Sequence, residues 1–278
     1  MNNDTWTSDT VPEHLKISPM GWVRVIARGV PLVSLILICL ALLLLVRLIE
    51  KPLYGEVRPW TPYITQFVCR SAFFIMGITY QTEGTVMRGP GAVVANHSSW
   101  LDIFALNAAK RIYFVSKDEV AGWPGIGWLA RATGTVFIRR DRKEAASQIA
   151  VFRERLAAGH KLLFFPEGTS TDGLQVLAFK PTLFAAFFDP ALKDTLAIQP
   201  VTVRYQAPEG ADQRFYGWWG DMELAPHLLG TLAASPQGRV TVVYHLPVQV
   251  ADYANRKVLA ADLEVAVRSG LAQHRIPE

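Results

Sequence analysis

Three runs of chemically capable residues in this 278-residue chain each follow directly after an apolar run of strand length. They are Asn96-His97-Ser98-Ser99-Trp100-Leu101-Asp102 after residues 92–95, Arg139-Arg140-Asp141 after residues 135–138, and Pro166-Glu167-Gly168-Thr169-Ser170 after residues 162–165. Ligands of open α/β sheets bind beyond the carboxyl ends of the strands. We therefore predict that the three runs contribute to one site.

His97 and Asp102 have the residue types and the spacing of an oriented general base. A carboxylate one helical turn beyond a histidine can bind one imidazole nitrogen and leave the other to accept a proton. The chain has no Gly-x-Ser-x-Gly sequence and neither Cys39 nor Cys69 lies near a predicted strand end, so the proton would come from a hydroxyl of the substrate. The alternative is that Asp102 caps a helix and His97 is a buried structural histidine. For the pair alone, this alternative is the commoner one.

Positive charge is concentrated in residues 131–161, which carry eight lysines and arginines against three acids, an excess larger than the +4 of the whole chain. Arginine suits bidentate binding of phosphate, so Arg139 and Arg140 are candidates for that role. We interpret Arg153 and Arg155 as members of a solvated helix face. A nucleic-acid partner is not expected, because the basic segment is short and no recognised binding module accompanies it.

The elements that must position these residues form an α/β pattern. Short apolar runs of strand length recur from about residue 84 onward, and helical stretches such as 141–158 and 255–274 accompany them. This alternation predicts a mixed, mostly parallel sheet flanked by helices. The composition, which is 50% apolar and 19% charged with two cysteines, excludes a disordered, collagen-like or disulfide-stapled protein.

Hydrophobicity, with a mean hydropathy of +0.19, is concentrated ahead of this pattern. Residues 29–46 contain no charge and as a helix are just long enough to cross a hydrocarbon layer of about 30 Å. Residues 64–80 form a shorter apolar segment, which we interpret as an interfacial or re-entrant partner. A signal peptide is disfavoured because no cleavage site follows the run, and a buried core helix is the remaining alternative. We predict a poorly ordered polar tail (1–20), a membrane helix or helical hairpin (21–80) and an α/β domain (81–278).

Four motifs in order resemble those of the glycerolipid acyltransferase family. They are the run from Asn96 to Asp102, Gly134-Thr135-Val136-Phe137-Ile138-Arg139-Arg140, Phe165-Pro166-Glu167-Gly168-Thr169 and Ile198-Gln199-Pro200-Val201, within about residues 84–250. The resemblance favours the catalytic interpretation of His97 over the structural one. It also implies that residues 81–278 form an acyltransferase domain.

The resemblance implies that His97, oriented by Asp102, takes the proton of the acceptor hydroxyl, which then attacks the thioester of acyl-CoA or acyl-acyl carrier protein. Apart from this acyl donor it implies no cofactor, and no metal site is expected because no ligand cluster has the right spacing. In the family the second motif contacts phosphate, the third binds the acceptor and the fourth shapes the acyl pocket. The substrate-binding residues that this implies are Asn96, Arg139, Arg140, Glu167, Gly168, Thr169 and Pro200.

One departure from the family bears on the acceptor. The third motif usually continues with an arginine, and here that position is Ser170. Residues 165–173 and 215–222 are similar to the branch that acylates lyso-ornithine lipid, whose headgroup is an amino acid. Because 1-acyl-sn-glycerol-3-phosphate is the commoner acceptor in the family, its conversion to phosphatidate is our first expectation, and lyso-ornithine lipid acylation is the alternative.

A non-catalytic, membrane-tethered lipid-binding protein is the alternative from another class, and the intact His97/Asp102 pair argues against it. The expected partners are membrane lipids and the acyl donor. The expected location is the inner (cytoplasmic) membrane, with the active site facing the cytoplasm.

Overall fold

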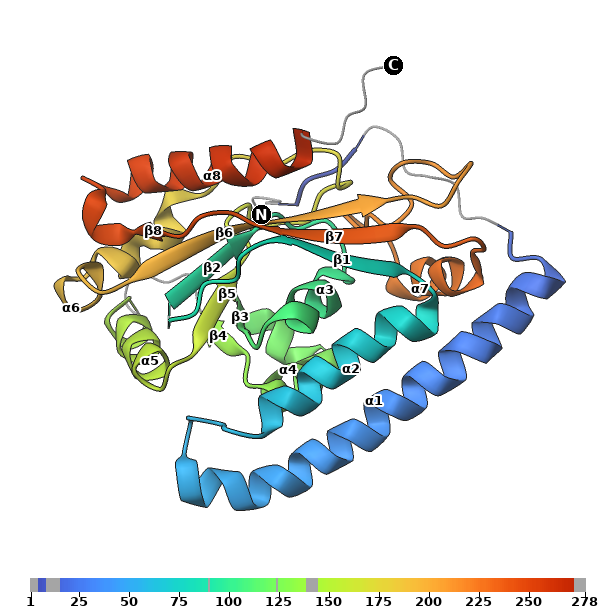
Figure 1. The fold of residues 1–278 in the computed structure, drawn as a ribbon, viewed down its shortest axis with the longest axis horizontal. Helices are drawn as coiled ribbons and strands as arrows, with labels where there is room; N and C mark the ends of the chain where they lie inside the picture. Colours follow the sequence, from blue (N-terminus) through green and yellow to red (C-terminus); the bar gives the residue numbers. More distant parts are fainter. Residues whose placement is uncertain (1–4, 9–15, 90, 124, 139–144, 273–278) are drawn as a thin grey trace.

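The structure is a computed structural model that describes residues 5–8, 16–89, 91–123, 125–138 and 145–272 (Figure 1). Two helices precede the sheet, α1 (Pro19–Tyr54) and α2 (Thr61–Met76). The Ser18 hydroxyl caps the start of α1 by accepting the Gly21 N–H at 3.1 Å. Helix α2 ends at Gly77, whose φ of 78° lies in the left-handed region that glycine tolerates.

One mixed sheet forms the centre of the molecule. Its strands are β1 (Thr79–Gly84), β2 (Gly91–Ala95), β3 (Tyr113–Lys117), β4 (Val136–Ile138), β5 (Lys161–Phe164), β6 (Ala197–Gln206), β7 (Arg239–Tyr244) and β8 (Val248–Gln249). The order is β1-β7-β6-β2-β5-β3-β4, with β8 beside β6. Strands β6, β2, β5, β3 and β4 are parallel, whereas β7 and β8 run antiparallel to β6. The predicted mixed, mostly parallel sheet is confirmed.

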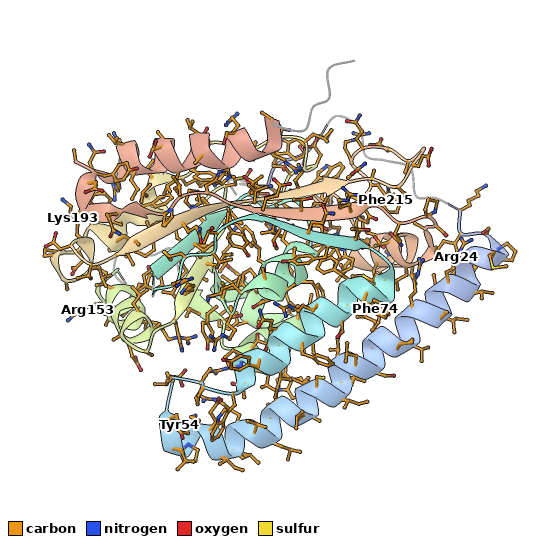
Figure 2. All side chains as sticks on the ribbon, viewed as in Figure 1. Arg24, Tyr54, Phe74, Arg153, Lys193 and Phe215 are labelled. Atoms are coloured by element: carbon orange, nitrogen blue, oxygen red, sulfur yellow. The ribbon has the colours of Figure 1, made fainter. Side chains whose placement is uncertain are left out.

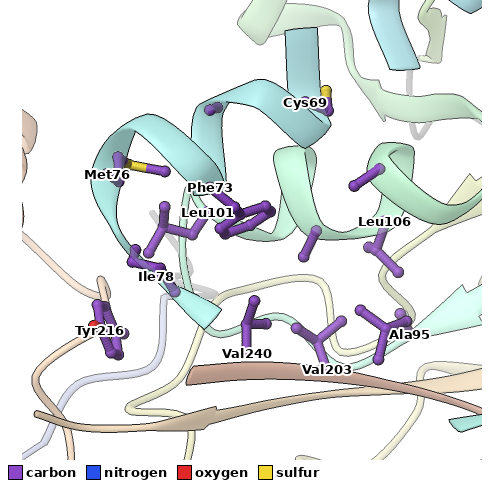
Figure 3. Packing of buried hydrophobic residues seen from close by; sticks show 14 of the residues in the cluster. Cys69, Phe73, Met76, Ile78, Ala95, Leu101, Leu106, Val203, Tyr216 and Val240 are labelled. Carbon is purple, nitrogen blue, oxygen red and sulfur yellow. The ribbon is translucent and has the colours of Figure 1, made fainter. Parts of the chain in front are cut away.

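Helices cover both faces of the sheet (Figure 1). They are α3 (Asp102–Ala109), α4 (Ile126–Thr133), α5 (Ala145–Ala157), α6 (Pro190–Lys193), α7 (Leu224–Ala233) and α8 (Arg256–Ala272), with 3₁₀ turns at Asp118–Gly122, Pro181–Phe188 and Val250–Asp252. One core lies between the sheet and helices α2 and α3, where Phe73 and Leu106 lie over Val203 and Val240 (Figure 3). The second core lies on the α8 face and includes Leu259 and Leu263.

The start of the sheet differs from the sequence-based expectation. The predicted apolar segment 64–80 is helical only as far as Met76. The left-handed Gly77 breaks the helix, and residues 79–84 then form the edge strand β1, which pairs parallel with β7. The polar residues of β1 alternate too weakly in hydrophobicity to identify it as a strand, and pairing with β7 decides its conformation.

Helix α1 lies along the domain and keeps an apolar surface outward. Many side chains project from the side of α1 that lies away from the sheet (Figure 2). Its exposed apolar residues include Val30, Leu37, Ile38, Leu45 and Leu48. Among the described residues it is the one helix long and apolar enough to cross a membrane. Monomeric soluble proteins rarely expose so large an apolar patch, so this surface indicates contact with lipid.

Both ends of α1 are fastened to the rest of the chain. Near its start, the Arg28 guanidinium donates to the carbonyl oxygens of Leu232 and Ala234 at the end of α7, at 2.8 and 2.7 Å. Near its end, the fully buried Glu50 accepts the backbone N–H of Thr61 at 3.0 Å and its hydroxyl at 2.7 Å, at the start of α2. Helices α1 and α2 therefore form a hairpin, and the linker between them is joined to the α/β domain by Arg58, whose guanidinium donates to the Ala132 carbonyl oxygen at 3.0 Å.

Candidate active site

His97 and Asp102 are brought together by the short connection between β2 and α3. Strand β2 ends at Ala95, and Asp102 is the first residue of α3. His97 Nδ1 lies 2.8 Å from Asp102 Oδ2, and the side chain of His97 is 23% exposed whereas that of Asp102 is completely buried. The buried carboxylate fixes the tautomer of the imidazole by accepting the Nδ1 proton. Nε2 then remains as the nitrogen that can accept a proton from a substrate.

Asp102 also organises the loop between β2 and α3. Its Oδ2 accepts the backbone N–H groups of Ser98 and Ser99 at 2.8 and 3.0 Å. Its Oδ1 accepts the hydroxyl of Tyr205 at 2.7 Å. The carboxylate thus orients the imidazole and holds the loop before α3, and no side chain forms a capping hydrogen bond at the start of this helix. Burial and the neighbouring Asp102 raise the pKa of Tyr205 well above its usual value, so Tyr205 remains a proton donor in this bond.

The third motif holds the imidazole and its backbone from the neighbouring strand. Strands β2 and β5 are adjacent and parallel, so their carboxyl ends lie side by side. The ring of Phe165 stacks on His97 with centroids 4.1 Å apart and planes at 14°. Two residues later, Glu167 Oε1 accepts the backbone N–H of His97 at 2.7 Å, and Oε2 accepts the N–H of Leu177 at 2.7 Å.

Glu167 is nearly inaccessible, with 1% of its surface exposed. Burial raises its pKa to about 8, against the hydrogen bonds from Leu177 and His97, which lower it. Each oxygen is within bonding distance of a backbone donor, so the carboxyl joins the His97 loop to the loop after β5. It shares this loop with Gly168, whose φ of 78° forms the turn. Glu167 is thus bonded to the backbone of His97, and its contact with the acceptor, which the family resemblance implied, stays a prediction.

Three further residues of the predicted substrate-binding set differ in their burial and surroundings. Asn96 is completely buried and bonds both backbone groups of Val203, at 2.9 and 2.8 Å, which ties the end of β2 to β6. Thr169 lies on the loop beside Glu167 and is partly exposed. Pro200 is buried in β6 opposite Val94 of β2, inside the sheet.

The second motif is described only as far as Ile138. Strand β4 ends at Ile138, and Arg139 and Arg140 lie outside the described residues. Their predicted role in binding phosphate therefore stays a prediction. Strand β4 is at the edge of the sheet, with β5 and β3 between it and β2.

The interpretation of Arg155 as part of a solvated helix face is wrong. Arg155 is 8% exposed, and its guanidinium donates to His160 Nδ1 at 2.7 Å and to the Gly134 carbonyl oxygen at 2.6 Å. It also lies 3.7 Å from Glu56, in the segment between α1 and α2. Its charge is used inside the protein to attach that segment to β4 and β5. Arg153, by contrast, is exposed as expected.

The two cysteines lie on α1 and α2 and not on the loops that hold His97. Both cysteines are buried in the helical hairpin, and burial raises the pKa of the Cys69 thiol to about 12, which disfavours the thiolate. Within the described parts of the chain, no three histidine, cysteine or carboxylate side chains are grouped so as to hold a metal ion. The arrangement can activate a hydroxyl brought by a substrate, and a general base of this kind suits group transfer to an alcohol.

The fold and this site define a class of α/β transferases, and comparison with known proteins specifies the family. Residues 77–204 match the family described as Acyltransferase. The chain is 56% identical over 273 residues to lyso-ornithine lipid O-acyltransferase of Rhodobacter capsulatus, which covers 98% of this chain and 99% of the relative. It is 31% identical over 181 residues to 1-acyl-sn-glycerol-3-phosphate acyltransferase of Neisseria gonorrhoeae, covering 65% and 69%. The chain belongs to the acyltransferase family, and it is an acyltransferase of lysolipids.

A solved structure agrees with the fold. The crystal structure of the 1-acyl-sn-glycerophosphate (LPA) acyltransferase PlsC from Thermotoga maritima matches with a TM-score of 0.57. It covers 90% of this chain and 99% of that chain at 19% identity, so the likeness concerns the fold.

Proposed function

We propose that the protein transfers a fatty acyl group to the free hydroxyl of lyso-ornithine lipid. The observation that carries this proposal is the 56% identity, across almost the whole chain, to a protein named for that activity. A second observation agrees with it, since Ser170 occupies the place where the family usually has an arginine suited to a phosphate group. The sequence-based ranking, with 1-acyl-sn-glycerol-3-phosphate first, is thereby reversed.

The proposed reaction follows from the geometry around the imidazole. His97 Nε2 takes the proton of the acceptor hydroxyl while the oxygen attacks the thioester carbonyl of the donor. The new C–O ester bond forms, the C–S bond breaks, and the imidazolium returns its proton to the leaving thiolate. Asp102, at 2.8 Å from Nδ1, stabilises the positive charge that develops on the ring. The donor is acyl-CoA or acyl-acyl carrier protein, and no enzyme-bound acyl intermediate is part of this sequence of steps.

The apolar surface of α1 suits a protein whose substrate and product both reside in a bilayer. Because Arg28 near the start of α1 bonds the end of α7 and Arg58 just after α1 bonds the Ala132 carbonyl oxygen, we propose that the helix is embedded along the membrane surface with its exposed aliphatic side. The proposed location is the inner membrane, with the active site facing the cytoplasm, where acyl donors are available.

The test is an acceptor comparison with purified protein in detergent. Labelled acyl-CoA and acyl-acyl carrier protein are each offered with lyso-ornithine lipid or with 1-acyl-sn-glycerol-3-phosphate, and the lipid products are separated. Transfer to lyso-ornithine lipid that is lost in His97→Ala supports the proposal. Transfer restricted to 1-acyl-sn-glycerol-3-phosphate contradicts it and favours the second candidate, phosphatidate synthesis, which rests on the 31% identity to the Neisseria enzyme. Lipid binding without turnover would favour a non-catalytic protein.

A further inference from the structure

Trp6, which precedes α1, contacts the loop after β5. Strand β5 is the neighbour of β2, the strand that leads to His97. The expectation of a poorly ordered tail does not hold for residues 5–8, which lie against the domain near the N label in Figure 1. The backbone N–H of Trp6 donates to Thr169 Oγ1 at 3.2 Å, and the Trp6 ring packs on the ring of Trp219 with centroids 6.0 Å apart. Two residues beyond Thr169, the Thr171 N–H donates to the His97 carbonyl oxygen at 2.9 Å. Trp6 therefore contacts a loop that is itself hydrogen-bonded to the backbone of His97.

The partner ring carries a hydrogen-bond donor without an acceptor. Trp219 is 2% exposed, and its indole N–H has no hydrogen-bond partner within the described portion of the chain. Buried polar groups are nearly always paired, because leaving one unpaired is costly. An oxygen atom of a bound molecule would satisfy this donor.

The two loops that carry these residues approach each other closely. A side-chain carbon at Gly217 would lie 2.7 Å from the carbonyl oxygen of Asp172 and 2.8 Å from the ring of Trp219, so only glycine fits. The next N–H along, that of Trp218, donates to the Ser98 carbonyl oxygen at 2.8 Å. Asp172, Trp219 and the catalytic loop consequently form one connected region.

The charge of this region is opposite to that of the whole protein. Residues 207–223 carry four acids and one base, Arg214, in a chain of net charge +4. The Arg214 guanidinium is paired with both oxygens of Asp212, at 3.0 and 2.7 Å. Asp172 is near enough to Arg214 to help raise its pKa, and it adds a further negative charge. Such a surface attracts a cation and disfavours a phosphomonoester.

We propose that Trp6, Asp172 and Trp219 bind the cationic amino-acid headgroup of the acceptor lipid. The headgroup ammonium would lie over the Trp6 indole in a cation–π contact and pair with the Asp172 carboxylate. The Trp219 N–H would donate to a carboxylate or amide oxygen of the same headgroup. This assignment rests on the proposed lyso-ornithine lipid activity, and it explains how an enzyme of this fold could select an ammonium in place of a phosphate.

The experiment measures kcat and KM with lyso-ornithine lipid and with 1-acyl-sn-glycerol-3-phosphate for Trp6→Leu, Trp6→Phe and Asp172→Asn. Trp6→Leu and Asp172→Asn are expected to raise KM for lyso-ornithine lipid about five- to tenfold with kcat nearly unchanged, since a cation–π or ion-pair contact of this kind acts in binding. Trp6→Phe keeps an aromatic face and should lose about threefold or less. Asp194→Asn makes the same charge change at an exposed position after α6 and should leave both constants unchanged.

A second measurement separates this proposal from the proposed function. Binding of lyso-ornithine lipid is measured for the inactive His97→Ala protein and for the same protein carrying Trp6→Leu or Asp172→Asn in addition. Weakened binding supports the headgroup site even if wild-type turnover proves restricted to another acceptor. Unchanged binding overturns it, as does an equal loss for both acceptors or an equal effect of Trp6→Leu and Trp6→Phe.

Discussion

The hydroxyl of Tyr205 donates a 2.7 Å hydrogen bond to Oδ1 of Asp102, which is 103 residues earlier in the chain. Tyr205 lies on β6, and β6 is the neighbour of β2, the strand that leads to the catalytic loop. The bond engages the carboxylate oxygen that does not contact His97. Tyr205 therefore acts on the imidazole through Asp102, as a positioning residue.

Tyr205→Phe removes this bond while keeping the ring that fills the core. We expect kcat to fall about tenfold, because a hydrogen bond to a charged group contributes about 1.5–3 kcal/mol and only part of it bears on the transition state. KM for the acceptor should change less than twofold. Steady-state kinetics of the variant check this, together with its pH–rate profile. A wild-type kcat would show that the other bonds of Asp102 suffice to position it.

Asp102→Asn tests the role of the negative charge beside the imidazole. Oδ2 accepts three N–H groups, so the amide oxygen of asparagine can take that place while the charge that stabilises the imidazolium is lost. We expect kcat to fall at least about 100-fold, the scale of general-base catalysis. Asp252→Asn, at an exposed position after β8, is the matched control. Substantial activity in Asp102→Asn would mean that orientation without charge is enough.

The local part of the site could be predicted from the sequence, and the non-local part could not. His97 and Asp102 are five residues apart across one strand-to-helix connection, so their contact follows from local geometry. Tyr205 on β6 bonds Asp102, and Glu167 on the loop after β5 bonds the backbone of His97, and no spacing in the sequence marks either as a partner of the pair. The motif resemblance identified Glu167, but it could not show that the carboxylate bonds the backbones of His97 and Leu177, because a motif does not report which atoms a residue contacts.

The burial of charged residues on an apparently amphipathic helix is a second feature that the sequence could not predict. Arg155 and Arg153 are both polar positions on α5, and periodicity treats them alike. Only the fold shows that Arg155 meets Glu56, which comes from the linker of the helical hairpin almost a hundred residues away. Trp6 is missed for the same reason, since its partners Thr169 and Trp219 belong to distant loops.

Glu167 gives a pH dependence of stability with a definite sign. Its pKa is about 8 in the folded protein against a usual value of 4.5, so between these values the folded state binds more protons than the unfolded state. Its contribution to stability is therefore greatest at low pH and declines as pH rises towards 8. Glu167→Gln cannot titrate. The free energy of unfolding of the wild type minus that of Glu167→Gln should fall by up to about 1.4 kcal/mol per pH unit between pH 5 and 8.

Denaturant unfolding in detergent at a series of pH values measures that difference. Comparing the two proteins at each pH cancels the titration of the other groups, including His160, whose pKa burial lowers to about 4. A difference that is constant or that increases with pH would contradict the prediction.

Arg155→Ala and Arg153→Ala form a matched pair on one helix. The first removes a buried guanidinium that bonds His160 and Gly134 and approaches Glu56, and we expect it to lower the free energy of unfolding by about 2–4 kcal/mol. The second removes an exposed guanidinium and should change stability by less than about 0.5 kcal/mol. Thermal unfolding of both variants in the same detergent decides between them. Equal effects would indicate that the Arg155 contacts contribute nothing beyond helix propensity.

The exposed side of α1 should govern membrane binding independently of folding. Leu37 and Ile38 are 59% and 68% exposed, so replacing either with aspartate leaves the protein core intact. A charged side chain in hydrocarbon costs about 2.5–3.5 kcal/mol. The double variant, with Leu37→Asp and Ile38→Asp, should therefore lose most of its flotation with phospholipid vesicles. Its melting temperature should stay near that of the wild type. Leu246→Asp, at an 85% exposed leucine outside the hairpin, should float like the wild type. If the double variant floats as fully as the wild type, the membrane contact is made by another surface, because two charges on this face would otherwise weaken it.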